Sequence, residues 1–199
     1  SWGNEVVQID ARGGRRVVEF DSVSHTFITR EERQANSDTT LVWSSEYDEV
    51  LGVVTRVVEP NGGTTRFEYD PLGRPVRTFT PDNESDEPTE SYSYVMSSPV
   101  SFVRVESTIG AEARRRVRFE FVDGEGRARA TAESASGGRW VFSDVASFGS
   151  RGWPSRIAIP HFRGSADVVT SAENLDGTSI AYDAIGREVR RQHPDSSFT

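Results

Sequence analysis

One short stretch, Tyr69-Asp70-Pro71-Leu72-Gly73-Arg74, constrains the fold of this chain more than any other. Asp70 suits the first position of a type I β-turn because its carboxylate can accept nearby backbone N–H groups, and Pro71 presets φ for the second position. Gly73 tolerates the positive φ that is needed to leave the turn. Apolar and polar residues alternate on both sides of the turn, so the stretch predicts a β-hairpin.

The same pattern recurs along the chain in intact and decayed copies. The copies begin near positions 20, 47, 69, 94, 122, 148 and 182, with an aromatic residue at each except Val122, and most spacings are therefore 22 to 28 residues. A period in this range indicates a repeat architecture, in which each unit buries its apolar face only against its neighbours. The motif residues are Tyr47, Asp48, Gly52, Tyr69, Asp70, Gly73, Arg74, Asp123, Gly126, Arg127, Phe148, Gly152, Tyr182, Asp183, Gly186 and Arg187.

Composition favours a thin β layer over a compact globule. Only 35% of the 199 residues are hydrophobic, and the mean hydropathy is −0.55. No apolar run approaches the roughly 18–20 residues needed to span a bilayer. The net charge of −8 argues against a nucleic-acid partner, which normally needs a basic face. The absence of cysteine excludes a disulfide framework and a thiolate metal site.

Strands are expected on both sides of each turn, over the whole of residues 1–199, with no obvious domain boundary. The basic cluster at residues 114–118 is expected to be the solvated face of a strand whose other face carries Phe119 and Phe121. Residues 29–36 could form either a short helical turn or a strand. Residues 81–88 are expected to be an exposed loop, because they are acidic and bracketed by prolines, and residues 163–177 are expected to be a longer loop, because they are small and polar.

Two copies carry a more specific pattern, in which Tyr-Asp-x-x-Gly-Arg is followed about seven residues later by Pro-Asp, at Pro81-Asp82 and Pro194-Asp195. This pattern resembles the signature of RHS/YD-repeat proteins, and the order of copies resembles the RHS region of bacterial toxin-complex B components and related large toxins. The resemblance implies an all-β ribbon of antiparallel hairpins that spirals into a hollow shell around a toxic C-terminal segment. In animal teneurins, it implies part of an adhesion ectodomain. Since Ser1 lies within the repeat pattern, the chain is expected to be a fragment of a larger array.

Residues that could carry chemistry do not form a recognised constellation. The histidines His25, His161 and His193 are scattered, and residues 149–152 fit a repeat turn better than the nucleophile elbow of a hydrolase. Asp82, Glu84 and Asp86 alternate as in a calcium loop but lack its glycine and its final glutamate. We therefore expect no catalytic residue, no cofactor and no metal, and we find no convincing copy of the autoprotease motif of the family.

The leading hypothesis is a structural segment of a β-shell in a large secreted or surface-delivered bacterial protein. Its partners would be the remainder of its own RHS shell and an enclosed toxin or effector segment, with no nucleic acid. The alternative is an extracellular binding or adhesion module that recognises glycans, such as a cell-surface carbohydrate, or a cell-surface receptor protein. Trp43, Trp140 and Trp153 would then be the binding residues, although core packing is the favoured role for them. An enzyme ranks last.

Overall fold

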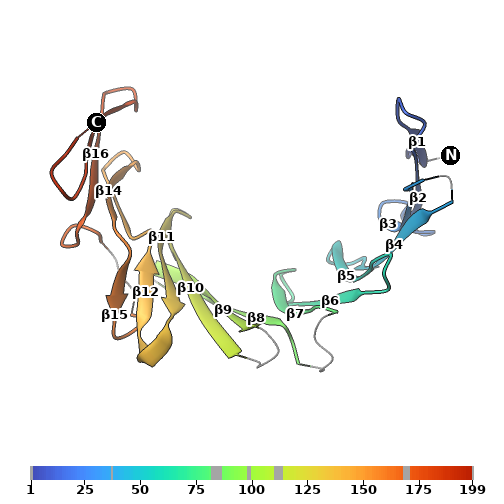
Figure 1. Cartoon of the computed structure of the whole chain (residues 1–199), viewed down its shortest axis with the longest axis horizontal. Helices are drawn as coiled ribbons and strands as arrows, with labels where there is room; N and C mark the ends of the chain where they lie inside the picture. The colour runs from blue at the N-terminus through green and yellow to red at the C-terminus, as the bar shows by residue number, and fades with distance from the viewer. Residues whose placement is uncertain are drawn as a thin grey trace. The chain divides into compact units, whose positions relative to one another are not determined.

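The structure, a computed structural model, describes residues 2–36, 38–81, 87–97, 100–109, 114–167 and 171–198. These residues form antiparallel β-strands and contain no α-helix; the one helical segment among them is a 3₁₀ turn at Ser136–Gly138 (Figure 1). The predicted all-β fold of repeated hairpins is confirmed. By internal contacts the chain divides into two compact units, Ser1–Ser91 and Tyr92–Thr199.

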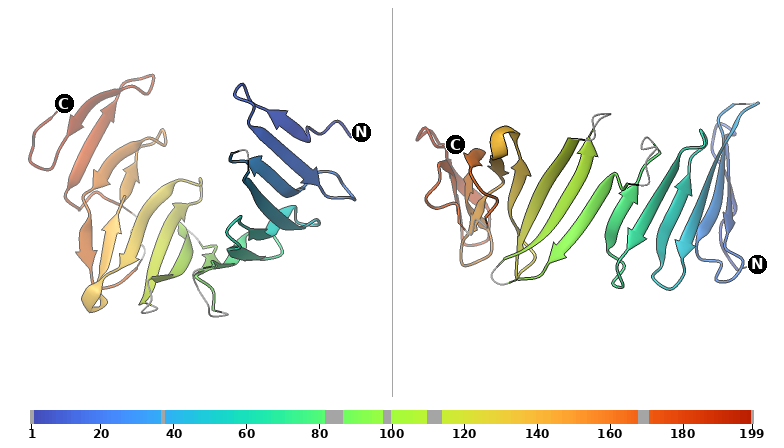
Figure 2. Two further views of the ribbon diagram at one scale, coloured as in Figure 1. Left: turned by 45° about the vertical axis from the view of Figure 1, so that its right-hand side comes forward. Right: turned by 90° about the horizontal axis from the view of Figure 1, so that it is seen from below.

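The first unit is one sheet in which each strand pairs with the next strand of the sequence, so the backbone groups of neighbouring hairpins satisfy one another. Figure 2 shows these strands side by side. Of residues 29–36, for which the sequence left two alternatives, residues 29–34 belong to a strand. The strands are β1 (Val7–Ile9), β2 (Arg15–Phe20), β3 (Ile28–Gln34), β4 (Thr40–Asp48), β5 (Val53–Val58), β6 (Thr64–Tyr69), β7 (Pro75–Phe79) and the start of β8 (Glu90–Val95).

This first sheet is a single thin layer, as its low apolar content predicted. Among its described residues, Val18 is the one hydrophobic side chain that is buried. The strand register places a row of charged residues on one face, where they form ion pairs across and along the strands. Such exposed pairs contribute little stability, typically about 0–1 kcal/mol each. The pairs are Arg30–Glu32, Arg56–Glu46 and Arg77–Glu68.

The second unit contains two sheets. The chain leaves the first of them after β12, builds a hairpin in the second, returns for one short strand, and then completes the second sheet. The first sheet contains β9 (Val100–Ile109), β10 (Arg114–Asp123), β11 (Ala128–Ser134), β12 (Trp140–Ser143) and β15 (His161–Arg163). The second sheet contains β13 (Ala146–Phe148), β14 (Pro154–Ala158), β16 (Gly177–Tyr182) and β17 (Glu188–Gln192).

A compact aromatic core holds the second unit together. Phe121 and Phe142 are 1% and 0% exposed, and their rings stack with centroids 6.3 Å apart. The opposite face of β10 is solvated, as expected from the basic cluster, and Arg118 there pairs with Glu120 at 2.7 Å. Burial of the aromatic side chains makes the hydrophobic effect the main stabilising force in this unit.

The long loop between β15 and β16 contributes a residue to this core. Ala172 is completely buried against it. The Arg156 guanidinium on β14 donates hydrogen bonds to the Ala172 carbonyl at 3.1 Å and to the Leu175 carbonyl at 2.6 and 3.1 Å. The loop was expected from its small polar residues, but its anchoring by an arginine was not.

We predict that Arg156→Met destabilises the second unit, because methionine cannot donate to the carbonyls that Arg156 satisfies. The expected loss is about 2 kcal/mol in the free energy of unfolding, since hydrogen bonds from a charged donor are worth about 1.5–3 kcal/mol. The measurement is urea unfolding followed by circular dichroism. Arg12→Met, at an exposed turn position, is the control and should change stability by less than about 0.5 kcal/mol. Equal unfolding midpoints for both variants would contradict the assigned role.

Candidate functional site

The motif turns close with the same pair of backbone hydrogen bonds. In the turn between β6 and β7, Asp70 N donates to Arg74 O at 2.9 Å and Gly73 N donates to Asp70 O at 2.9 Å. Gly73 has a φ of +74°, in the left-handed region that favours glycine. The strands shift register beside the turn, at Glu68/Tyr69. This geometry is a type I turn followed by a glycine bulge, as in three-residue hairpin loops.

The Asp70 carboxylate binds the turn that it begins. Its Oδ1 accepts hydrogen bonds from the backbone N–H groups of Leu72 at 2.9 Å and Arg74 at 3.0 Å, and its Oδ2 accepts one from Arg74 Nε at 2.7 Å. We call this arrangement the aspartate–arginine clamp. Two further clamps, with equivalent distances of 2.7–3.0 Å, are formed by Asp123, Glu125 and Arg127 and by Asp183, Ile185 and Arg187.

The clamps favour ionised aspartates. Desolvation opposes ionisation of Asp70 and Asp123, but hydrogen bonds from the arginine side chain and the turn backbone outweigh it and lower the pKa of each. For Asp183 the hydrogen bond from Arg187 is the largest cause of the lowered pKa. Sequence reasoning gave the motif arginine no partner, although its constant position four residues after the aspartate was the available signal.

Two altered copies, at residues 48–52 and 149–152, keep a turn and lack the arginine of the clamp. Gly149 takes the place of the aspartate, yet Gly149 N still donates to Trp153 O and Gly152 N to Gly149 O, both at 2.9 Å. The prediction that residues 149–152 form a repeat turn is confirmed. In the longer copy, Asp48 Oδ1 accepts from the N–H groups of Val50 and Leu51 at 2.9 Å each.

Tyr47 and Tyr69, which begin two copies in the first unit, lie where neighbouring strands stop pairing. The β5–β6 register ends at Arg56↔Arg66, and beyond it the Tyr69 hydroxyl donates to Val54 O at 2.7 Å. In the same way, the Tyr47 hydroxyl donates to Ile28 O at 3.0 Å beyond the last β3–β4 pair. Each tyrosine therefore satisfies a carbonyl that the ladder between those two strands does not reach.

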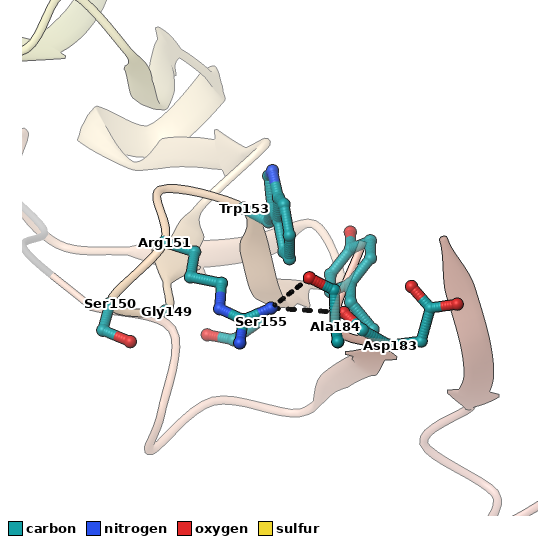
Figure 3. A pocket seen from close by; sticks show the side chains of 8 residues that line it. Gly149, Ser150, Arg151, Trp153, Ser155, Asp183 and Ala184 are labelled. Atoms are coloured by element: carbon teal, nitrogen blue, oxygen red, sulfur yellow. Dashed lines mark hydrogen bonds between the residues drawn. The ribbon is translucent and has the colours of Figure 1, made fainter. Parts of the chain in front are cut away.

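In the second unit, successive turns also contact one another through side chains. The Arg127 guanidinium of one clamp lies over the Phe148 ring of the next copy, with its Cζ 4.4 Å from the ring centroid. Figure 3 shows the next contact, in which Arg151 Nη1 donates to Asp183 O at 3.3 Å and Ala184 O at 2.9 Å. The two turns border a shallow pocket of about 330 Å³, lined by Gly149, Ser150, Arg151, Trp153, Ser155, Tyr182, Asp183 and Ala184.

The three tryptophans proposed as binding residues all have packing contacts. The ring centroids of Trp153 and Tyr182 are 5.3 Å apart, as are those of Trp140 and Phe119. The Arg33 Cζ lies 5.5 Å from the centroid of the Trp43 ring. These contacts favour the packing role that the sequence analysis preferred. The position of each tryptophan can be explained without an external ligand.

The other face of the first unit's sheet carries a charged cluster around Glu31. Glu31 accepts hydrogen bonds from Arg16 Nε at 2.8 Å and Arg33 Nε at 2.5 Å. The hydrogen bond from Arg16 is the largest cause of a pKa of about 2 for Glu31, and desolvation opposes it. The cluster therefore stores a stabilising interaction that requires the ionised carboxylate.

The histidines lie in unrelated settings. His25 stacks on Trp2 with centroids 4.6 Å apart, whereas His161 is hydrogen-bonded through Nδ1 to Ile159 O at 3.0 Å. No group of three or more acidic or histidine side chains in the described part of the chain is arranged to hold a metal ion. The calcium-like residues Asp82, Glu84 and Asp86 lie outside the described residues. No described helix is long and apolar enough to cross a membrane.

Comparison with known proteins gives a family for one segment and a fold for most of the chain. Residues 47–84 match the RHS Repeat family. The crystal structure of TcdB2-TccC3 matches with a TM-score of 0.75 and 18% identity, covering 93% of this chain and 12% of that chain. The crystal structure of TcdB2-TccC3 without its hypervariable C-terminal region matches with a TM-score of 0.72 and 14% identity, covering 93% and 14%. No curated protein matches the sequence.

A Photorhabdus luminescens Tc holotoxin pore with a mutated TccC3 is also similar, with a TM-score of 0.75, 15% identity and coverage of 93% and 14%. The resemblance to RHS-repeat proteins is thereby confirmed by the family match at residues 47–84 and by the shared fold. Most of the chain has the fold found in these toxin-complex structures. This chain spans between 12% and 14% of their lengths.

We predict that two motif glycines differ in their tolerance of alanine. Both have positive φ, but a Cβ on Gly126 would meet no atom within 4 Å, whereas one on Gly186 would lie 2.7 Å from Trp153 Cζ2. Gly126→Ala should therefore cost only backbone strain, about 1 kcal/mol. Gly186→Ala should cost about 1–3 kcal/mol more, because Trp153 must move. Urea unfolding of both variants measures the difference. Equal losses would show that Trp153 yields freely.

We also predict that ionised Glu31 stabilises the first unit above about pH 4.5, its ordinary pKa, and that this contribution disappears as the pH falls to about 2. The sign follows because protonation is easier in the unfolded chain than in the folded one. Glu31→Gln should remove this part of the pH dependence, whereas Glu49→Gln, at an exposed turn position, should not. Unfolding midpoints measured across the acid range test this, and an unchanged pH profile for Glu31→Gln would refute it.

Proposed function

We propose that this chain is a segment of the wall of a larger β-shell that encloses or presents a polypeptide cargo. The observation that carries the proposal is the match of 93% of the chain to the fold of much longer toxin-complex chains. The repeated turns support it, because units that differ little can be added along a sheet without a new core for each. Residues 1–199 would then be one repeat region within a larger array.

In this proposal the motif residues have a structural role. The aspartate–arginine clamps fix the ends of the hairpins, and the aromatic residues connect them to neighbouring strands or turns. Four residues illustrate the two roles: Asp70 and Arg74 within a turn, and Tyr69 and Val54 between strands. No nucleophile with an adjacent histidine lines the pocket at residues 149–155 and 182–184 in the described chain. The chain itself would be a wall without catalytic activity.

The partners would be the remainder of the shell and an enclosed toxin or effector segment. The similar structures are those of TcdB2-TccC3 and of a Tc holotoxin pore, and both support assembly with other toxin components. The location would be secreted or at the cell surface. A glycan- or receptor-binding module is less well supported, because its three candidate tryptophans are in packing contacts.

The test uses the complete native polypeptide that contains this chain. Its intact mass and terminal sequences establish how much chain surrounds these residues, and cryo-electron microscopy shows whether the hairpins continue around an enclosed segment. Limited proteolysis gives a second measurement. The cargo segment should resist trypsin in the complete protein and be digested when it is produced alone. A native polypeptide whose sheets leave both faces in solvent would overturn the proposal.

A further inference from the structure

The turn between β5 and β6 contains the one asparagine in the sequence that is followed by glycine. Asn61 and Gly62 are both exposed, and Gly62 has a φ of +85°. We propose that Asn61 is a modification site, at which the folded chain deamidates spontaneously. The inference is independent of the shell function, because it depends only on this turn.

The reaction requires water and no other reagent. The backbone nitrogen of Gly62 attacks Asn61 Cγ, a five-membered succinimide forms, the Cγ–Nδ2 bond breaks, and the side-chain nitrogen leaves as ammonia with the proton from Gly62 N. Water then adds to one of the two succinimide carbonyls and opens the ring to aspartate or isoaspartate. Glycine assists because it has no side chain to obstruct the approach of its nitrogen.

The hydrogen bonds of the turn act on both reacting groups. Gly63 N donates to Asn61 Oδ1 at 2.9 Å, which draws electron density from Cγ and stabilises the charge that develops on Oδ1 during attack. Gly62 N donates to Glu59 O at 2.9 Å, and this bond must open before the nitrogen can attack. Because the attacking nitrogen must lose its proton, the rate should rise with pH.

A second turn shows which product the fold accommodates. In the turn that follows β17, Asp195 Oδ1 accepts a hydrogen bond from Ser197 N at 2.9 Å, the same contact that Asn61 Oδ1 makes with Gly63 N. The backbone pair is also equivalent, since Ser196 N donates to His193 O at 3.0 Å. An aspartate at position 61 should therefore preserve the turn.

Isoaspartate should disrupt the same turn. It places one additional CH₂ group in the main chain between residues 61 and 62. The hydrogen bond from Glu59 N to Gly63 O, now 2.8 Å, closes this loop and depends on the normal chain length. The isoaspartate form should therefore loosen the β5–β6 hairpin, whereas the aspartate form should not.

The test incubates the full chain at neutral and mildly alkaline pH and follows it by tryptic peptide mapping. Cleavage after Arg56 and Arg66 releases residues 57–66, in which Asn61 is the single asparagine. Asn61 in this peptide should be converted to the acid at least about tenfold faster than Asn174 in its own peptide, and the conversion should be faster at higher pH. An unchanged peptide 57–66, or equal rates at both asparagines, would overturn the proposal.

Two further measurements separate reactivity from effects on folding. The same incubation in denaturant gives the rate without the turn; a native rate equal to or above it supports assistance by Gly63 N, whereas a rate far below it would show that the fold protects Asn61. The Asn61→Asp variant should unfold at the same urea concentration as the unmodified chain, and the separated isoaspartate form should unfold at a lower one. A destabilised Asn61→Asp variant would refute the equivalence with Asp195.

Discussion

The paired backbone hydrogen bonds that close each motif turn are the constraint on which the hairpins depend, and at the intact copies an aspartate carboxylate supports them. At a turn the strand ladder ends, and several backbone N–H groups lose their partners. Asp70 supplies an acceptor for two of them and pairs with the arginine that follows the turn. The same contacts recur at Asp123 and Asp183, so one local solution positions hairpins in both units.

The two units stabilise their sheets differently around these common turns. The first has a thin layer, in which tyrosine hydroxyls satisfy carbonyls where strands stop pairing and charged residues cover one face. The second gathers phenylalanines into a core that a loop residue, Ala172, helps to fill. A repeat architecture tolerates this variation, since each hairpin needs only its neighbours for support.

The turns also explain why the motif can decay without loss of the fold. Gly149 has no carboxylate, yet its turn retains both backbone hydrogen bonds and gains contacts from Arg151 and Trp153 to the following turn. The turn between β5 and β6, which is not a copy of the motif, uses the Asn61 side chain as an acceptor instead. Backbone geometry is thus more constant than the side chain that supports it.

The sequence by itself determined the local structure of this protein. Asp70, Pro71 and Gly73 specify a turn through their own backbone preferences, and alternation around them specifies strands, so the all-β repeat fold could be read without coordinates. Tertiary structure decided the contacts between residues far apart in the sequence. The return of β15 to its sheet, the anchoring of Ala172 by Arg156 and the packing of Trp153 on Gly186 all depend on which segments meet in space. Local backbone preferences carry no information about such meetings, and packing between the elements settles them.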